Sequence, residues 1–144
     1  MMRIGQLAQS ANCTTETIRF YEKEGLLPEP ARTAGNYRHY HQQHLERLCF
    51  IRNCRSLDMT HDEIRSLLTF MDTPPESCTP VNNLIDEHIK HVDIRLAELQ
   101  QLRRSLVALR KKCATTQAVP DCGIIRGLTA MDPEPTSRSG SHVD

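Results

Sequence analysis

The chain contains six cysteines, and their thiols are the side chains with the most distinctive chemistry in the sequence. In a reducing compartment, cysteines serve as metal ligands, as reactive thiols or as small buried apolar residues. No Cys-x-x-Cys pair occurs, which argues against a zinc knuckle and against a thiol oxidoreductase. Any metal site must therefore be assembled from distant parts of the chain. The six are Cys13, Cys49, Cys54, Cys78, Cys113 and Cys122.

Two of these cysteines flank a segment with the pattern of a long helix. From Val81 to Cys113, apolar residues recur at steps of three and four, interrupted by His88 and Arg95. A helix of about 32 residues is roughly 48 Å long. Cys78 and Cys113 of one chain therefore cannot share an ion while this helix is intact. A simpler alternative remains, in which Cys113 only ends the apolar stripe and Cys78 is an incidental loop residue.

The apolar stripe needs a partner, because a single helix cannot bury it. The chain has no second long helix, so we predict a homodimer held by an antiparallel coiled coil. This arrangement places Cys78 of one subunit beside Cys113 and Cys122 of its partner, forming two identical sites. Thiolates select soft or borderline cations over Mg²⁺ or Ca²⁺. The basic run that ends the helix would offset the excess negative charge.

The other cysteines and a histidine in the stripe have less specific interpretations. Cys13, Cys49 and Cys54 occupy helical or turn positions and are expected to be ordinary buried thiols. His88 breaks the apolar stripe, and His91 is nearby. A polar residue at such a position more often fixes the register of a coiled coil than binds a metal. An auxiliary ligand role for His88 remains the alternative.

The first part of the chain predicts a winged helix-turn-helix. A short helix from Ile4 to Ser10 is followed by a second helix that Thr14 or Thr15 can cap and Gly25 ends. Residues 31–41 carry a turn between alternating basic and phenolic residues, which is typical of a hairpin. Two further helices are expected, over about 43–56 and after a capping box formed by Thr60 and Glu63.

In such a domain the second helix enters the major groove of DNA and the wing grips the backbone. Arginine reaches base edges or phosphates, and hydroxyl groups suit phosphates. We expect Thr17, Arg19 and Tyr21 to point their polar ends outward, although Tyr21 and Tyr37 would alternatively pack on the core. The candidate DNA contacts are Thr17, Arg19, Tyr21, Tyr37, Arg38 and Tyr40.

Composition narrows the functional class. The 144 residues favour one mainly helical protein, since aromatic residues make up 4% and Trp is absent. No apolar run approaches a membrane span, and the start of the chain lacks a secretory signal, so we expect a cytoplasmic protein. The 18 basic and 18 acidic residues cancel only in total. Five arginines and one acid occupy residues 31–55, and local patches decide binding to DNA.

These motifs resemble the MerR family of transcriptional regulators. The family's opening resembles residues 3–8, its recognition helix and exit resemble residues 17–28, and its wing resembles residues 36–40. The resemblance to the lead- and cadmium-responsive branch extends to about residue 128. It implies a homodimer that binds promoter DNA, represses without metal, and activates resistance or efflux genes with metal. Activation would come from distorting the promoter so that RNA polymerase engages both of its elements.

The same resemblance implies that Cys78, Cys113 and Cys122 bind a divalent heavy-metal ion. Pb²⁺ is favoured over Cd²⁺ because the tail contains only His142 rather than a histidine-rich run. Hg²⁺ and Zn²⁺ stay open, as does a related regulator that senses thiol oxidation. No enzyme is expected. The predicted organisation is a DNA-binding domain (1–72), a linker and dimerisation helix (73–112), a metal-binding loop with a short helix (113–131) and a disordered tail (132–144).

Overall fold

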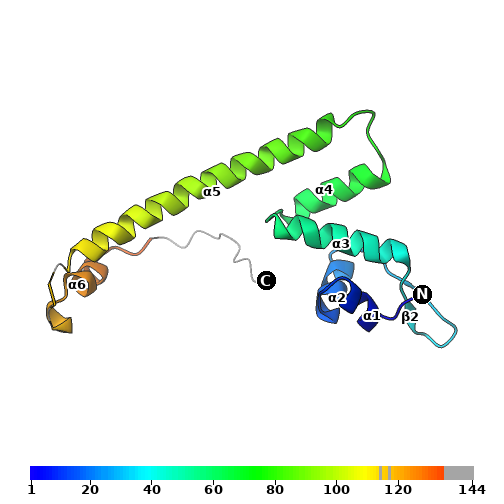
Figure 1. The fold of residues 1–144 in the computed structure, drawn as a ribbon, viewed down its shortest axis with the longest axis horizontal. Coiled ribbons are helices and arrows are strands. Elements are labelled where there is room, and N and C mark those ends of the chain that lie inside the picture. Colours follow the sequence, from blue (N-terminus) through cyan, green and yellow to red (C-terminus); the bar gives the residue numbers. More distant parts are fainter. Residues whose placement is uncertain (114, 117, 135–144) are drawn as a thin grey trace. The chain divides into compact units, whose positions relative to one another are not determined.

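The computed structural model describes residues 1–113, 115–116 and 118–134. The chain is mainly helical, as predicted, with a small two-stranded wing (Figure 1). Its elements form two compact units, Met1–Ile89 and a second unit from Lys90 onward. The predicted tail over 132–144 lies mostly outside the described residues, and so does His142. Among the described residues, none of the helices combines the length and apolarity needed to cross a membrane.

The first unit begins with the helix-turn-helix and the wing. The helices are α1 (Ile4–Ser10) and α2 (Thr15–Lys23), and the antiparallel strands are β1 (Ala31–Arg32) and β2 (Arg38–His39). Thr14 caps α2 by accepting a hydrogen bond from the backbone N–H of Thr17 at 3.2 Å. Gly25, with φ of +74°, follows α2 in a backbone conformation that favours glycine.

Helices α3 (Gln42–Ser56) and α4 (His61–Asp72) complete the domain. The predicted capping box is confirmed: Thr60 accepts from the backbone of Glu63, and the Glu63 carboxylate accepts from the backbone of Thr60. The core that these elements share is apolar. Its largest fully buried side chains are Tyr40, Leu7, Ile18, Leu26, Leu27, Leu48, Ile51 and Ile64.

Tyr21 corrects one expectation from the sequence. The residue is 5% exposed rather than directed outward. Its ring packs beside Phe20 and meets the ring of His61 edge-on at 6.2 Å. Burial raises the pKa of the Tyr21 hydroxyl. The position of Tyr21, three residues after the buried Ile18, places its ring on the core face of α2.

Helix α5 (Thr79–Lys111) is one continuous helix, visible as such in Figure 1. Its first turns belong to the first unit, where the partly buried Val81, Leu84 and Ile85 pack against the core of the winged helix-turn-helix domain. The expectation that the whole apolar stripe faces a second copy was therefore wrong for this stretch. These side chains are already covered by their own domain. The exposed part of the stripe runs from Ile89 to Val107.

Beyond α5, the described part of the second unit contains two short helices. The 3-10 helix η1 (Val119–Asp121) leads into α6 (Gly123–Ala130), with Cys122 at the N-cap of α6. The sequence predicted a short helix within residues 113–131, and the structure has a helix of eight residues there, in which the large apolar residues Ile125 and Leu128 are about half exposed.

The N-cap of α2 gives a first test. Replacing Thr14 with Ala removes the acceptor for the Thr17 N–H and should lower the free energy of unfolding by about 1 kcal/mol. The matched variant Thr14→Ser keeps the hydroxyl and should stay near wild type. Urea unfolding followed by circular dichroism measures both. Equal losses in the two variants would show that the hydroxyl does not stabilise α2.

Candidate nucleic-acid interface and metal centre

The outer face of α2 carries Arg19, which is exposed on the surface of the domain. Thr17 is half-buried, and its hydroxyl lies 2.9 Å from that of Thr14. On the wing, Tyr37 is 60% exposed, and the guanidinium of Arg3 lies 5.3 Å from the centre of its ring. A cation over an aromatic face is attracted by the ring quadrupole. The recognition helix and the wing thus both carry exposed basic or phenolic side chains.

A buried carboxylate ties the wing to the recognition helix. The side chain of Glu22 on α2 is 6% exposed and accepts hydrogen bonds from Arg38 at 2.9 Å and from the hydroxyl of Tyr40. Burial, together with the hydrogen bond to Glu22, raises the pKa of Tyr40 to about 12. Arg38 and Tyr40 both lie at the end of the wing, so this contact fixes the wing against α2. Charge-assisted hydrogen bonds of this kind are the strong ones.

Sequence reasoning missed Glu22. Its position four residues after Ile18 places both on the core-facing side of α2, and a buried acid needs partners. The spacing from Ile18 could therefore have identified Glu22 as a buried residue in need of partners. Tyr40, predicted as a DNA contact, is fully buried and supports the wing from inside the core. Contact with DNA stays a prediction for all six residues proposed from the sequence.

The arginines of residues 31–55 divide into two groups. Arg47 forms a two-pronged contact with Asp72 at 2.9 and 3.1 Å and donates to the Leu26 carbonyl at 3.1 Å. This contact lowers the pKa of Asp72. Two more, Arg52 and Arg55, also donate to backbone carbonyls. Most of the basic run therefore holds the domain together. Of the two arginines on the wing, Arg38 does so as well, through Glu22, and Arg32 is exposed.

Two of the three predicted metal ligands come together in the second unit. The thiol of Cys113, just after α5, lies close enough to interact with the thiol of Cys122 at the N-cap of α6, and it also donates to the carbonyl of Thr115 at 3.4 Å. That contact and partial desolvation raise the pKa of Cys113. The backbone N–H groups of Ile125 and Ile124 lower the pKa of Cys122. A helix N-terminus stabilises a thiolate in this way, so Cys122 is the thiol that ionises more readily.

The charge near this pair suits a bound cation with several thiolates. The guanidinium of Arg110 donates to the Cys113 carbonyl at 2.8 Å, and its charge acts to lower the pKa of both thiols. Thiolates are soft donors that suit heavy-metal ions. Two adjacent thiols with a neighbouring basic group therefore fit such an ion, and they leave its further coordination positions open.

Gly123 allows the two thiols to meet. A Cβ atom at this position would overlap the carbonyl oxygen of Lys112 and lie 3.0 Å from its carbonyl carbon. Glycine, which has no Cβ, lets α6 begin this close to the backbone at the end of α5. The close approach brings the N-cap residue Cys122 next to Cys113.

Cys78 lies in the first unit, immediately before α5, and is exposed. It lines an open apolar hollow of about 390 Å³ together with Phe50, Phe70, Met71 and Val81. The helix that separates Cys78 from Cys113 in the sequence is unbroken, as the argument for a shared site requires. Within one chain, the contact between predicted ligands that the structure shows is the one between Cys113 and Cys122.

The remaining cysteines behave as predicted from the sequence. Cys54 is buried in the core, and Cys13 and Cys49 are half-buried against it. Burial raises the pKa of the thiols of Cys13 and Cys54. A thiol whose ionisation is disfavoured is a poor nucleophile and a poor ligand.

Known protein families and relatives match this chain over most of its length. The family model for MerR HTH family regulatory proteins matches residues 2–70, and the model "MerR, DNA binding" matches residues 45–109. The HTH-type transcriptional regulator ZntR homolog of Haemophilus influenzae is 46% identical over 119 residues, covering 83% of this chain and 88% of its own length. The chain belongs to the MerR family. It is thus a regulator of transcription rather than an enzyme.

Two further similar proteins of this family are described together with a heavy metal. The transcription regulator PbrR691 from Ralstonia metallidurans, whose crystal structure is in complex with lead(II), shares 52% sequence identity with this chain. The two structures match with a TM-score of 0.79. The alignment covers 89% of this chain and 99% of that one. The mercuric resistance operon regulatory protein of Bacillus cereus is 36% identical, over 88% of this chain and 96% of its own length.

The tie between wing and recognition helix can be tested with Glu22→Gln. The variant keeps the shape of the side chain but replaces the charged carboxylate, which accepts hydrogen bonds from Arg38 and Tyr40, with a neutral amide. We expect the free energy of unfolding to fall by about 1–3 kcal/mol in urea denaturation. Glu46→Gln, on the exposed face of α3, is the matched control and should change little. If Glu22→Gln is as stable as the control, the buried carboxylate does not hold the wing.

The thiol pair makes a prediction about reactivity. In metal-free, reduced protein, alkylation of Cys122 by iodoacetamide should reach half its maximal rate at a lower pH than alkylation of Cys113, because the pKa of Cys122 is lowered and that of Cys113 is raised. Mass spectrometry of peptides over a pH series measures both rates. Arg110→Gln should move both midpoints to higher pH, since the guanidinium favours both thiolates. An equal midpoint for the two thiols would contradict this assignment.

Proposed function

We propose that this MerR-family regulator binds promoter DNA as a homodimer and senses a divalent heavy-metal ion. Without the ion it represses, and with the ion it activates resistance or efflux genes. The observation that carries the proposal is the pair of neighbouring thiols, Cys113 and Cys122, which interact with each other and with Arg110 at the end of α5. A pair of thiols beside a basic residue is suited to a soft cation and has no evident use in packing.

The exposed part of α5 supports the dimer. Val92, Leu99, Leu102 and Leu106 are each between 43% and 56% exposed, at helical steps that form one stripe. A second copy of the same helix, running antiparallel, would cover this stripe. It would also bring Cys78 of one subunit to the thiol pair of its partner, which completes a site of three thiolates at each end.

The proposed effector is Pb²⁺. The support is the 52% identity to a regulator whose crystal structure is in complex with lead(II). Cd²⁺, Hg²⁺ and Zn²⁺ remain alternatives, because thiolates bind all of them. The relative named for mercuric resistance, at 36% identity, is the reason to keep Hg²⁺ among the ions tested.

The proposed mechanism follows from linkage between two states of the dimer. An ion that binds one arrangement of the two DNA-binding domains more tightly shifts the population toward it. That arrangement would bend and untwist the promoter, at a cost in DNA deformation energy, so that RNA polymerase engages both promoter elements. The Glu22 contact matters here because it makes the wing and α2 move as one piece.

Replacing Cys78 tests the proposal in a promoter–reporter strain exposed to a panel of ions. Cys78→Ser should abolish induction by Pb²⁺, while binding to the promoter in gel shifts should stay near wild type because Cys78 lies outside the winged helix-turn-helix. Cys49→Ser, which changes a half-buried thiol of the DNA-binding domain, is the matched control and should respond normally. Full induction of Cys78→Ser would rule out this metal site.

Mixed dimers test whether the site is shared between subunits. Neither a Cys78→Ser homodimer nor a Cys113→Ser homodimer would have a complete site. A heterodimer of the two variants would keep one site, formed by Cys78 of one subunit with Cys113 and Cys122 of its partner. Titration with Pb²⁺ after refolding the variants together should therefore recover one tight site in each heterodimer. Recovery of none would show that the thiols are not shared in this way.

A second candidate function is sensing of thiol oxidation. The direct contact between Cys113 and Cys122, with the lowered pKa of Cys122, favours it, since thiolates react most readily with oxidants. Intact-protein mass spectrometry separates the two functions. A metal sensor gains the mass of bound ions, whereas an oxidation sensor loses two hydrogens or gains oxygen after treatment with peroxide.

A further inference from the structure

His88 lies where α5 leaves the surface of the DNA-binding domain. Its side chain is 12% exposed, whereas the residues from Ile89 to Ala108 are all exposed. The side chains one and two turns earlier, Ile85 and Val81, are apolar ones that pack on the core. His88 is therefore the polar end of the contact that joins the start of α5 to this domain.

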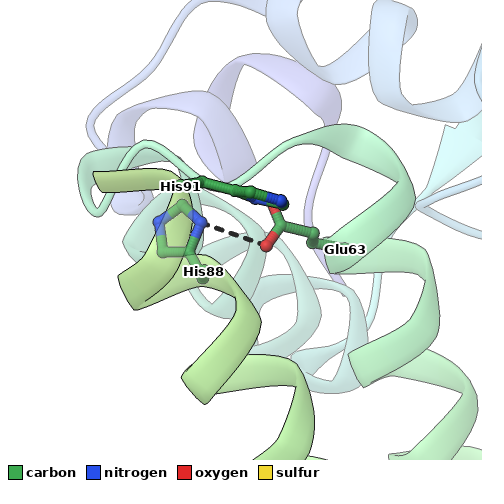
Figure 2. A group of neighbouring side chains, drawn as sticks. All are labelled: Glu63, His88 and His91. Atoms are coloured by element: carbon green, nitrogen blue, oxygen red, sulfur yellow. Dashed lines mark ion pairs between the residues drawn. The ribbon is translucent and has the colours of Figure 1, made fainter. Parts of the chain in front are cut away.

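The two nitrogens of the His88 ring meet two different helix ends. Nε2 lies 2.8 Å from the carbonyl oxygen of Leu57, the residue that caps the end of α3. Nδ1 lies 3.0 Å from Oε2 of Glu63, in the first turn of α4 (Figure 2). A carbonyl oxygen only accepts, so Nε2 donates this hydrogen bond, and the contact with Glu63 becomes an ion pair when the ring is protonated. The carbonyl groups at a helix end lack a partner within the helix, and His88 supplies one to the Leu57 cap.

The two carboxylate oxygens of Glu63 contact different groups. Oε1 accepts from the backbone N–H of Thr60 at 3.0 Å, which is the capping box of α4, while Oε2 faces His88. Moving the start of α5 away would therefore disturb the partners of both the end of α3 and the beginning of α4.

The first turn of α4 also contacts the recognition helix. The ring of His61 lies 5.4 Å from that of Phe20 and 6.2 Å from that of Tyr21, both on α2. One turn further, Arg65 donates to the Glu24 carbonyl at the end of α2 at 2.9 Å. The beginning of α4 thus touches α5 through Glu63 and α2 through His61.

We propose that His88 and Glu63 are positioning residues that couple α5 to the recognition helix α2 through the first turn of α4. The proposal rests on the proposed function, in which the thiols that follow α5 bind the ion. A shift of α5 on metal binding would be passed to α4 by the contact between His88 and Glu63, and to α2 by the rings that pack on His61. Neither residue binds the ion in this scheme.

Glu63→Gln is a sharp test because glutamine preserves the capping box but removes the charge that faces His88. We expect the ratio of transcription with Pb²⁺ to transcription without it to fall by roughly 2- to 30-fold, the range for residues that modulate coupling between sites. Stability in urea, the number of ions bound, and binding of the metal-free protein to the promoter should not change.

His88→Leu should lower the same ratio further, because it removes the contacts with both helix ends. The double variant should be no worse than His88→Leu, since both residues act in one contact. Asp86→Asn, which changes an exposed neighbour on α5, is the matched control and should keep the wild-type ratio.

Hydrogen exchange on the metal-free protein gives a readout that does not depend on the effector. In Glu63→Gln and in His88→Leu, the backbone amides of residues 57–64 and of the end of α2 should exchange faster than in wild type. In Asp86→Asn they should exchange at the wild-type rate. Unchanged exchange and unchanged induction in a folded His88→Leu variant would overturn the proposal. Loss of a bound ion in either variant would also overturn it, since these residues would then be ligands. If wild type responds to no ion, the proposed function fails, and exchange still decides whether α5 is coupled to α2.

Discussion

An unbroken helix of 33 residues decides which cysteines of one chain can lie together in a metal site. At 1.5 Å per residue α5 is roughly 50 Å long, so Cys78, before its first turn, and Cys113, after its last, cannot meet within one subunit. The chain itself brings together only the two thiols that follow the helix, among the ligands predicted. Everything proposed about a shared site and a dimer depends on this continuity, because a break in α5 would let one chain close a site by itself.

The arginines of this protein have separate local roles and do not form one basic face. Arg47, Arg52 and Arg55 use their guanidinium groups on a carboxylate or on backbone carbonyls of the DNA-binding domain. Arg19 lies exposed on the recognition helix, where it can meet a polyanion. Arg110 lies beside the thiols. A net charge of zero is thus compatible with DNA binding, since the basic groups that matter act locally.

The parts predicted correctly from the sequence are those that local chemistry decides. The cap at Thr14, the capping box at Thr60 and the helical spacing of α5 each depend on residues within one or two turns, and each was confirmed. The contacts that sequence reasoning missed join distant residues, such as Glu22 with Tyr40 and His88 with Glu63. Helical periodicity marks which face a residue occupies. It does not say whether that face is covered by a second copy or, as at the start of α5, by the domain's own core.

The close approach at Gly123 has a consequence for how the ion preference of such a protein can evolve. A larger side chain there would push α6 away from the backbone of Lys112 and separate Cys122 from Cys113. Variation that keeps the thiol pair must therefore leave this glycine in place. In the proposed site, we expect changes in ion preference that keep this pair to lie in the segment between the two cysteines and around Cys78. Gly123 thus constrains the proposed binding site although it contributes no ligand.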